Sequence, residues 1–481
     1  MILGDDDSGK VSESTPLLGE TSGTSVVVTA PVPPPAYAPP ASPNHSAIYA
    51  TDVDVEPIVR NRFWRAFLIA LGMWLLASIL LGTVLDDVDG IQSLWNRKYP
   101  TIPDVKMDCM NSWADQHHQN PIHSAFPYST DTTFSIPVGP EAFLLFSRGT
   151  LSAGTLRVVA APATSDSSDA VIQIKMHYFV KKIRDQAQVC LIGRKTGEWG
   201  VAILTPKLWF SPSRTEHLFF DLVLALPQTN SSVYVNGLVT DLDNFEQVVE
   251  APLQVGHLSI KGTNGGIRTK TLEAQNATLV TTNGEISMDN LISRRTRVVT
   301  SNAAILGTVK AVDSVDLHTS NGPIRVDVDL DAGNSTTTKD VTIQTSNGVI
   351  QSSVRLNGTN ATSSFHVKHI TTNGQVVAKI ASLPLDAELQ VIASTSNSPV
   401  VLSLPLTYEG DLRAYGNDGI GVKPVDPLER DPAGKGRTWD LDMGVLRMSL
   451  MSGSVSWDRK NMHRGSAVAT TENGPATIYF S

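Results

Sequence analysis

The chain has 481 residues, with 38 lysine and arginine side chains against 47 aspartate and glutamate side chains, so its formal net charge at pH 7 is −9. This acidic balance argues against a nucleic-acid partner, because surfaces that bind nucleic acids are basic. The sequence contains no nucleophile elbow, P-loop or dinucleotide-binding fingerprint. We therefore expect neither an enzyme nor a cofactor.

Residues 1–62 are expected to form a disordered cytoplasmic tail, because they are rich in Pro, Ser, Thr and Gly and offer little to a core. One motif resembles the PPxY ligand of WW domains, which indicates a WW-domain ubiquitin ligase as a partner. A second resembles an acidic dileucine sorting signal, which clathrin adaptors read. The first consists of Pro34, Pro35 and Tyr37, and the second of Glu13, Leu17 and Leu18. The alternative for both is chance in a low-complexity segment.

Residues 63–85 are predicted to form a transmembrane helix. The part from 66 to 85 carries no charge, and its length is what a hydrocarbon core of ~30 Å requires. Arg60, Arg62 and Arg65 precede it, whereas Asp86 and Asp87 follow it. Basic flanks stay in the cytoplasm. The sequence therefore predicts an uncleaved signal anchor of a single-pass type II protein, at the cell surface or in the endosome or vacuole.

Residues 86–131 read as a stalk, followed by a β-sandwich-like membrane-proximal region over residues 132–254. Short apolar runs bounded by turn residues favour antiparallel strands in that region. It could instead be a cap over the first of the repeats that follow. Cys109 and Cys190 are the only cysteines, and in an oxidising lumen we expect a disulfide between them. Two separate thiols are the alternative.

Five of the six sequons for N-glycosylation that we consider occur after the predicted helix, in agreement with a lumenal or extracellular location. The sixth, at Asn44, lies before it and is expected to stay unmodified in a cytoplasmic tail. The candidate glycosylation sites are Asn230, Asn276, Asn334, Asn357 and Asn360. Three of them lie in Gly-, Asn-, Ser- and Thr-rich insertions, where a glycan would find solvent.

Residues 255–405 contain an internal repeat marked by asparagines, most of them followed by glycine. The asparagines are Asn264, Asn283, Asn302, Asn321, Asn347, Asn373 and Asn397, spaced by 19, 19, 19, 26, 26 and 24 residues, with a late echo at Asn473. Apolar and Thr positions alternate with polar ones on both sides, as in half-buried strands. We expect Asn and Gly to provide left-handed turn conformations. Turn chemistry is the main explanation for the asparagines, and a stacked ladder of their side chains is the second.

The constant step of 19 residues favours a β-solenoid over a hairpin meander, because stacked coils must keep one perimeter. The repeated Thr-(Thr/Ser)-Asn-Gly-x-Ile units resemble the adhesin-like β-solenoid repeat family, as in uncharacterised fungal single-pass membrane proteins. The resemblance implies an all-β fold and an adhesive ectodomain, and it brings no catalytic residues. The longer steps predict exposed loops at residues 332–338 and 357–362.

Residues 406–481 are expected to form a C-terminal β cap, with strands at 445–450 and 476–480 and an exposed loop at 423–437. His369 falls on an inward position and is expected to be a core histidine with its hydrogen bonds satisfied, or to mark a shift of register. Asp327 opens a calcium-loop-like run, but residues 332 and 338 do not fit that loop. Alternating acids on an outward strand face are the better interpretation.

The sequence therefore predicts a non-enzymatic type II membrane protein whose solenoid ectodomain binds a glycan or protein ligand. One alternative is an endosomal or vacuolar adaptor that recruits a WW-domain ubiquitin ligase through its tail. Another is a carbohydrate-active β-helix enzyme, which would need converging carboxylates. The repeats offer Asp289, Asp313, Asp316 and Asp327 for that role.

Overall fold

The computed structural model describes residues 105–110, 113, 118–119, 125–137, 141–161, 169–194, 197–206, 213–227, 233–359, 363–423 and 430–481. All of them belong to one compact unit that spans residues 93–481. The predicted tail, both of its motifs and the predicted membrane helix at 63–85 lie outside the described residues. Among the described helices, none is long and apolar enough to cross a membrane.

The described chain is all-β, with two series of paired strands that begin in the N-terminal part. The strands there are β1 (Val105–Met110), β2 (His118–Gln119), β3 (Tyr128–Ile136), β4 (Phe143–Arg148), β5 (Gly154–Ala160), β6 (Ala170–Tyr178), β7 (Gln188–Arg194), β8 (Trp199–Leu204), β9 (Leu218–Leu226), β10 (Val233–Asp241) and β11 (Phe245–Val249), with α3 (Lys181–Arg184) and the 3-10 turn η1 (Arg214–Glu216) between them. One series runs β3–β6–β9–β5–β11 and the other β1–β7–β8–β4–β10.

The antiparallel pairing expected for a sandwich occurs only among the outer strands of this region, β3–β6–β9 and β1–β7–β8. β4 pairs in parallel with β8 and β10, and β5 pairs in parallel with β9 and β11. β10 and β11 then pair in parallel with β12 and β13. The region is therefore continuous with the repeats, which agrees with the alternative that it covers the first of them.

The segment expected to be a stalk, residues 86–131, contains β1 and the start of β3. β1 pairs with β7 along its whole length. Met107 and Cys109 pack against a small apolar cluster that includes Ile192 and Ala202. This burial explains why the segment joins the sheet, a feature that its polar flanks hid.

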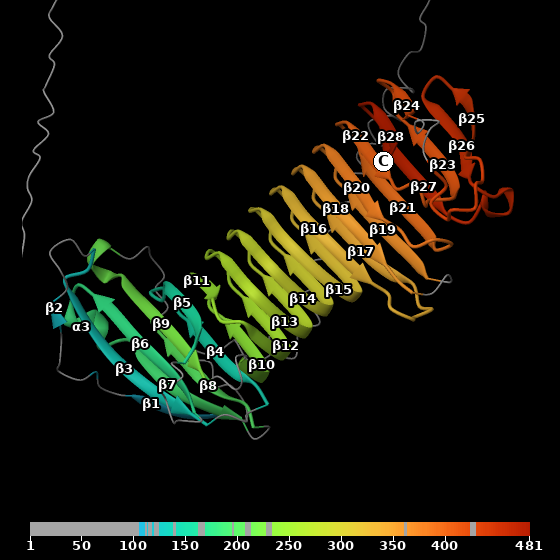
Figure 1. The fold of residues 1–481 in the computed structure, drawn as a ribbon. Helices are drawn as coiled ribbons and strands as arrows, with labels where there is room; N and C mark the ends of the chain where they lie inside the picture. The colour runs from blue at the N-terminus through green and yellow to red at the C-terminus, as the bar shows by residue number, and fades with distance from the viewer. Residues whose placement is uncertain are drawn as a thin grey trace, which may run out of the picture. The chain divides into compact units, whose positions relative to one another are not determined.

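The repeats pair in parallel, one above another, as Figure 1 shows from β12 to β22. Their strands are β12 (Leu253–Lys261), β13 (Ile267–Val280), β14 (Ile286–Val299), β15 (Ile305–His318), β16 (Ile324–Asp331), β17 (Lys339–Gln344), β18 (Ile350–Asn357), β19 (Ser364–Ile370), β20 (Val376–Ser382), β21 (Glu388–Thr395) and β22 (Val400–Leu404). Equivalent residues of successive repeats are direct partners, for example Ile267, Ile286 and Ile305. Because every such pair is parallel, the hairpin meander is excluded for these strands. We call these strands the repeat stack.

The 19-residue and 26-residue repeats differ in how the chain passes from one series of pairings to the other. In the 19-residue repeats one long strand of 14 residues, such as β13, serves both series of pairings. In the 26-residue repeats two shorter strands replace it, and residues 332–338 and 358–363 connect them. The predicted insertions therefore lie where the repeat lengthens.

The C-terminal strands are not stacked in chain order. They are β23 (Gly410–Tyr415), β24 (Ile420–Lys423), β25 (Asp440–Arg447), β26 (Leu450–Ser456), β27 (Ser466–Thr471) and β28 (Ala476–Phe480), with the 3-10 turn η2 (Arg459–Asn461) before β27. β27 pairs with both β21 and β23, and β28 pairs with both β22 and β24. The end of the chain thus lies between the last repeat and a pair of strands that precede it in sequence.

The expected strand at 445–450 is instead the tip of a hairpin. β25 and β26 pair antiparallel, and the turn falls at residues 448–449. The segment 445–450 is mainly apolar and contains no Gly, Pro or Asn, so it gave little turn signal apart from Ser449. The expected strand at 476–480 is β28.

Candidate functional site

A ladder of nine asparagine side chains runs along one edge of the repeat stack. Its members are Asn244, Asn264, Asn283, Asn302, Asn321, Asn347, Asn373, Asn397 and Asn473. From Asn264 onward each Nδ2 donates to the Oδ1 of the preceding member, at 2.6–2.8 Å. The side chains are exposed except for Asn244, which is half-buried. Each exposed amide therefore has a second N–H beyond the one in the ladder, whereas the Nδ2 of Asn244 donates to the carbonyl oxygen of Ser152.

Sequence reasoning missed the first rung of this ladder. Asn244 follows Asp243 and precedes Phe245, so it lacks the glycine of the other repeats. Its distance from Asn264, 20 residues, was the signal that could have found it. The late echo at Asn473 is the last rung, and its Nδ2 reaches back to Asn397.

Buried threonines fix the turns that carry the asparagines. The Oγ1 of Thr345 donates to the carbonyl oxygen of Gly322 in the preceding repeat at 3.2 Å. It also accepts the backbone N–H of Gly348 at 3.1 Å. Thr281, Thr319 and Thr371 repeat this pattern. Buried hydroxyls that are fully bonded hold the turn in one conformation.

The glycines beside the asparagines are explained by close approach and not by left-handed backbone. Neither these asparagines nor these glycines have a φ in the left-handed region. A Cβ on Gly348 would lie 1.8 Å from the carbonyl oxygen of Gly322, and one on Gly284 would lie 1.9 Å from that of Gly265. The expectation of left-handed turns was therefore wrong, and backbone stacking is the reason for glycine.

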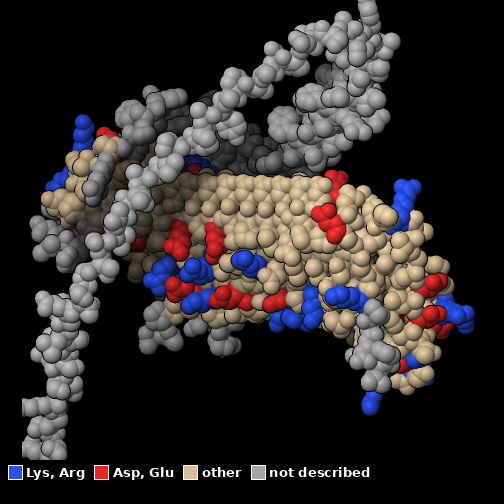
Figure 2. Space-filling view, turned by 90° about the horizontal axis from the view of Figure 1, so that it is seen from above, with Lys and Arg blue, Asp and Glu red and all other residues tan. Residues whose placement is uncertain are grey.

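The turns present little charge to solvent. Apart from Asp243, Glu246, Glu285 and Glu472, the four residues from the one before each ladder asparagine to the second one after it are uncharged. Figure 2 shows a broad band without Lys, Arg, Asp or Glu along the repeat stack, bordered by a row in which both signs alternate. Uncharged amides in a fixed array are suited to hydrogen bonding with neutral polar groups.

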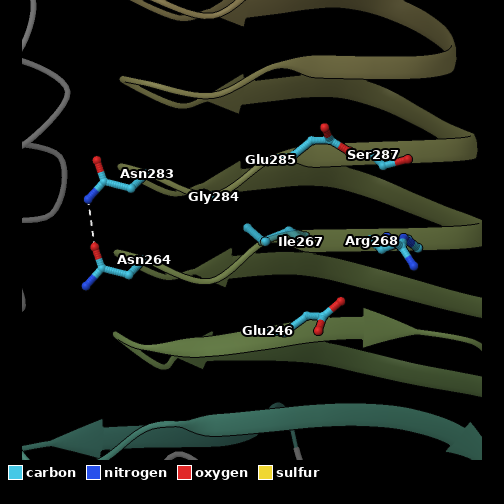
Figure 3. Close-up of a pocket in the computed structure, with 9 residues that line it drawn as sticks. Glu246, Asn264, Ile267, Arg268, Asn283, Gly284, Glu285 and Ser287 are labelled. Atoms are coloured by element: carbon cyan, nitrogen blue, oxygen red, sulfur yellow. Dashed lines mark hydrogen bonds between the residues drawn. The ribbon is translucent and has the colours of Figure 1, made fainter.

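A shallow depression of about 410 Å³ lies beside the ladder at its N-terminal end, and Figure 3 shows its walls. Its lining residues are Glu246, Asn264, Gly266, Ile267, Arg268, Asn283, Gly284, Glu285 and Ser287. They come from β11, β13 and β14 and the turns before them. Arg268 is the direct partner of Ser287 on the neighbouring strand.

The charged side chains that line the depression do not form ion pairs with one another. Glu246, Arg268 and Glu285 are exposed, and within the described part of the chain none of them forms an ion pair. The depression therefore combines two carboxylates, one guanidinium and two amides that a ligand can contact.

The acids considered for catalysis are engaged elsewhere or isolated. Lys339 bonds to Asp313 at 2.9 Å and holds the pKa of that carboxyl below its usual value. Arg297 pairs with Asp316 at 3.2 Å. Asp289 and Asp327 are exposed on their strands. No cluster of three or more His, Cys, Asp or Glu side chains suited to a metal occurs among the residues with described positions.

His369 is a core residue, as one of the two expectations had it. It is fully buried, and its Nε2 lies 2.7 Å from the Oγ of Ser352. Its Nδ1 has no hydrogen-bond partner, so the expectation of satisfied hydrogen bonds holds only for Nε2. Burial lowers the pKa of His369 to about 4.

The two cysteines form a disulfide in the structure. Cys109 on β1 lies directly opposite Cys190 on β7, and the bond joins segments 81 residues apart. The bond ties the start of the described chain to the sheet that continues into the repeats.

The candidate glycosylation sites differ in their surroundings. Asn276 is exposed on β13, and Asn334 is exposed in the connection between β16 and β17. The Nδ2 of Asn357 donates to Oδ1 of Asp329 at 2.5 Å, so the nitrogen that a glycan would modify is already engaged. Asn230 and Asn360 lie outside the described residues.

Comparisons with known proteins give little beyond this geometry. No family model matches the chain, and no curated protein matches it. A solved structure of a putative cell adhesion protein from Clostridium sporogenes is 9% identical, with a TM-score of 0.18, over 73% of this chain and 100% of that one. A putative adhesin from Parabacteroides merdae is 9% identical, with a TM-score of 0.25, over 55% of this chain and 95% of that one. At these TM-scores neither protein defines the ligand of this chain.

Proposed function

We propose that the chain is a non-enzymatic, single-pass type II membrane protein whose β-solenoid ectodomain serves adhesion or ligand binding. The uncharged stretch at residues 66–85, with arginines before it and aspartates after it, supports the anchor and its orientation. The parallel register of the repeat stack supports the solenoid. The disulfide supports an oxidising compartment.

The observation that carries the binding role is the asparagine ladder beside the depression. Hydrogen bonds and buried threonines hold the amides in fixed positions, so a ligand would find them ordered before it binds. Preorganisation reduces the entropy lost on association. Arg268, Glu246 and Glu285 add charged contacts at one end of this surface. A glycan, or a protein that presents repeated polar groups, suits such an array.

The tail motifs would direct the sorting and turnover of this protein in the cell. A clathrin adaptor would read the signal around Leu17 and Leu18, and a WW-domain ubiquitin ligase would bind around Tyr37. Cycling between the cell surface and the endosome or vacuole follows from both. Tyr37→Ala tests the tail: slower turnover of the protein itself fits this role, whereas lost ubiquitination of other proteins alone would favour the adaptor alternative.

Binding is tested with the full chain in nanodiscs against a panel of immobilised polysaccharides and glycoproteins. Arg268→Ala is expected to weaken the strongest interaction about tenfold, the effect of losing one good charged contact. Arg325→Ala is the matched control, because Arg325 is also exposed and occupies the same outward column three repeats further on. Equal effects of the two variants, or no binding to any member of the panel, would contradict the proposal.

A further inference from the structure

The tip of the β25–β26 hairpin carries the most exposed large apolar side chains in the described part of the chain. Val445 is 66%, Leu446 66% and Met448 100% exposed, and Arg447 between them is exposed as well. Other exposed apolar side chains, such as Leu385 at 42%, are less accessible and lie on other elements. Figure 1 shows β25 and β26 at the C-terminal end of the repeat stack.

A bulge accounts for the exposure of two successive residues. The register of β25 against β26 shifts between Val445 and Arg447, so Leu446 is the extra residue. Bulges redirect side chains that would otherwise alternate between the two faces of a strand. Val445 and Leu446 therefore both face solvent, next to Met448 in the turn.

Neither folding nor turn chemistry explains these residues. Met448 contributes nothing to a core, and methionine is not a turn-forming residue. Exposed apolar side chains that gather in one place mark interaction sites. The tip is thus built to contact something apolar.

The size of the tip argues for a lipid surface and against a folded protein. Three aliphatic side chains offer roughly 300 Å² of apolar area, whereas stable protein interfaces bury about 600 Å² or more on each partner. A bilayer interface accepts a small apolar wedge without a complementary shape, and a neighbouring cation strengthens the contact with anionic headgroups. Arg447 supplies that cation within the wedge.

We propose that the hairpin tip formed by Val445, Leu446, Arg447 and Met448 inserts into the surface of a bilayer that contains anionic lipid. The three apolar side chains enter the boundary between headgroups and acyl chains. The guanidinium of Arg447 remains at the phosphate level, as long cationic side chains do. The C-terminal cap then contacts a membrane independently of the predicted helix at 63–85.

The test uses the full chain held in nanodiscs of phosphatidylcholine alone. Added vesicles of phosphatidylcholine with phosphatidylserine should sediment the protein, whereas empty nanodiscs should stay in solution. The double variant Leu446→Asp/Met448→Asp is expected to bind these vesicles at least about tenfold more weakly, because charged residues are excluded from the apolar boundary. Replacing phosphatidylserine with phosphatidylcholine in the vesicles should also weaken binding.

The matched control is Val312→Asp/Leu385→Asp, which changes two exposed apolar residues elsewhere. It should bind as the unchanged protein does. A fluorescent label attached to the thiol of a Met448→Cys variant gives a second readout, because its fluorescence should shift when vesicles are added. Sedimentation that is absent, or lost equally in both double variants, would overturn the proposal. So would a tip variant that instead converts an oligomer to a monomer, since the tip would then be an interface between copies.

Discussion

Asn283 donates its side-chain N–H to the side-chain oxygen of Asn264, 19 residues earlier, at 2.6 Å. The same bond recurs between Asn302 and Asn283. Each repeat is therefore aligned with the next by an exposed side-chain hydrogen bond as well as by backbone pairing. Nearest-neighbour contacts of this kind set the stability of a repeat array.

Breaking the ladder in its interior should cost more than removing its last rung. Asn321→Ala removes two ladder bonds, one donated to Asn302 and one accepted from Asn347. Asn473→Ala removes only the bond to Asn397. We expect losses of about 2 and 1 kcal/mol in the free energy of unfolding, from the net value of a neutral hydrogen bond. Chemical denaturation of both variants checks this ratio, and equal losses would contradict the additive ladder.

The close contact of stacked turns makes one glycine intolerant of any side chain. Gly348→Ala would place its Cβ 1.8 Å from the carbonyl oxygen of Gly322, so the backbone of the stack must shift. We expect a loss of about 3 kcal/mol, the cost of overpacking a tight site. Gly421→Ala is the control, because its nearest neighbour would be a methyl group at 3.8 Å. A thermal midpoint that falls in both variants alike would refute the explanation.

The buried histidine should make stability depend on pH. Its pKa is about 4 in the folded protein and about 6.5 when unfolded. Between these values the unfolded chain binds more protons, so stability falls as pH drops from about 6.5 to about 4, by about 3 kcal/mol in total.

His369→Leu should remove this part of the pH dependence. The variant leaves the Ser352 hydroxyl without its partner at every pH, which shifts stability by a constant amount. Denaturation midpoints of both proteins between pH 4 and pH 8 measure the difference. Parallel pH profiles would show that His369 does not titrate as its burial implies.

The disulfide should stabilise the N-terminal strands. It closes a loop of 81 residues, and loop closure of this length is worth about 4.5 kcal/mol in the chain-entropy model. Reductant should therefore lower the thermal midpoint of the unchanged protein. It should leave the Cys109→Ser/Cys190→Ser variant unaffected, and a midpoint insensitive to reductant in both would contradict the role of the bond.

The sequence revealed the repeat stack because periodic residues repeat a periodic environment. Ile286, Ile305 and Ile324 recur at one spacing and become direct partners in the structure. The sequence did not predict the pairing order of the last strands. Asn473 follows Asn397 by 76 residues, and no regular spacing indicates that a later strand pairs with the last repeat.

The proposed binding surface was harder to predict than the stack. Asparagine before glycine reads as a turn, and only the register reveals that the amides bond to one another. Arg268 and Glu285 belong to different repeats, and only stacking brings them to one depression. The exposed hairpin tip escaped notice because Val445, Leu446 and Leu450 read as a strand.

The proposed function rests on the predicted anchor at residues 63–85 and its orientation, because only a repeat stack outside the cytoplasm could meet an external ligand. The most direct measurement is protease protection in microsomes, combined with glycosidase treatment of the protected fragment. We expect a protected fragment that contains the whole repeat stack and shrinks on deglycosylation, with a smaller change in Asn276→Gln/Asn334→Gln. A stack that is digested and carries no glycan would face the cytoplasm, and the adhesive role would be wrong.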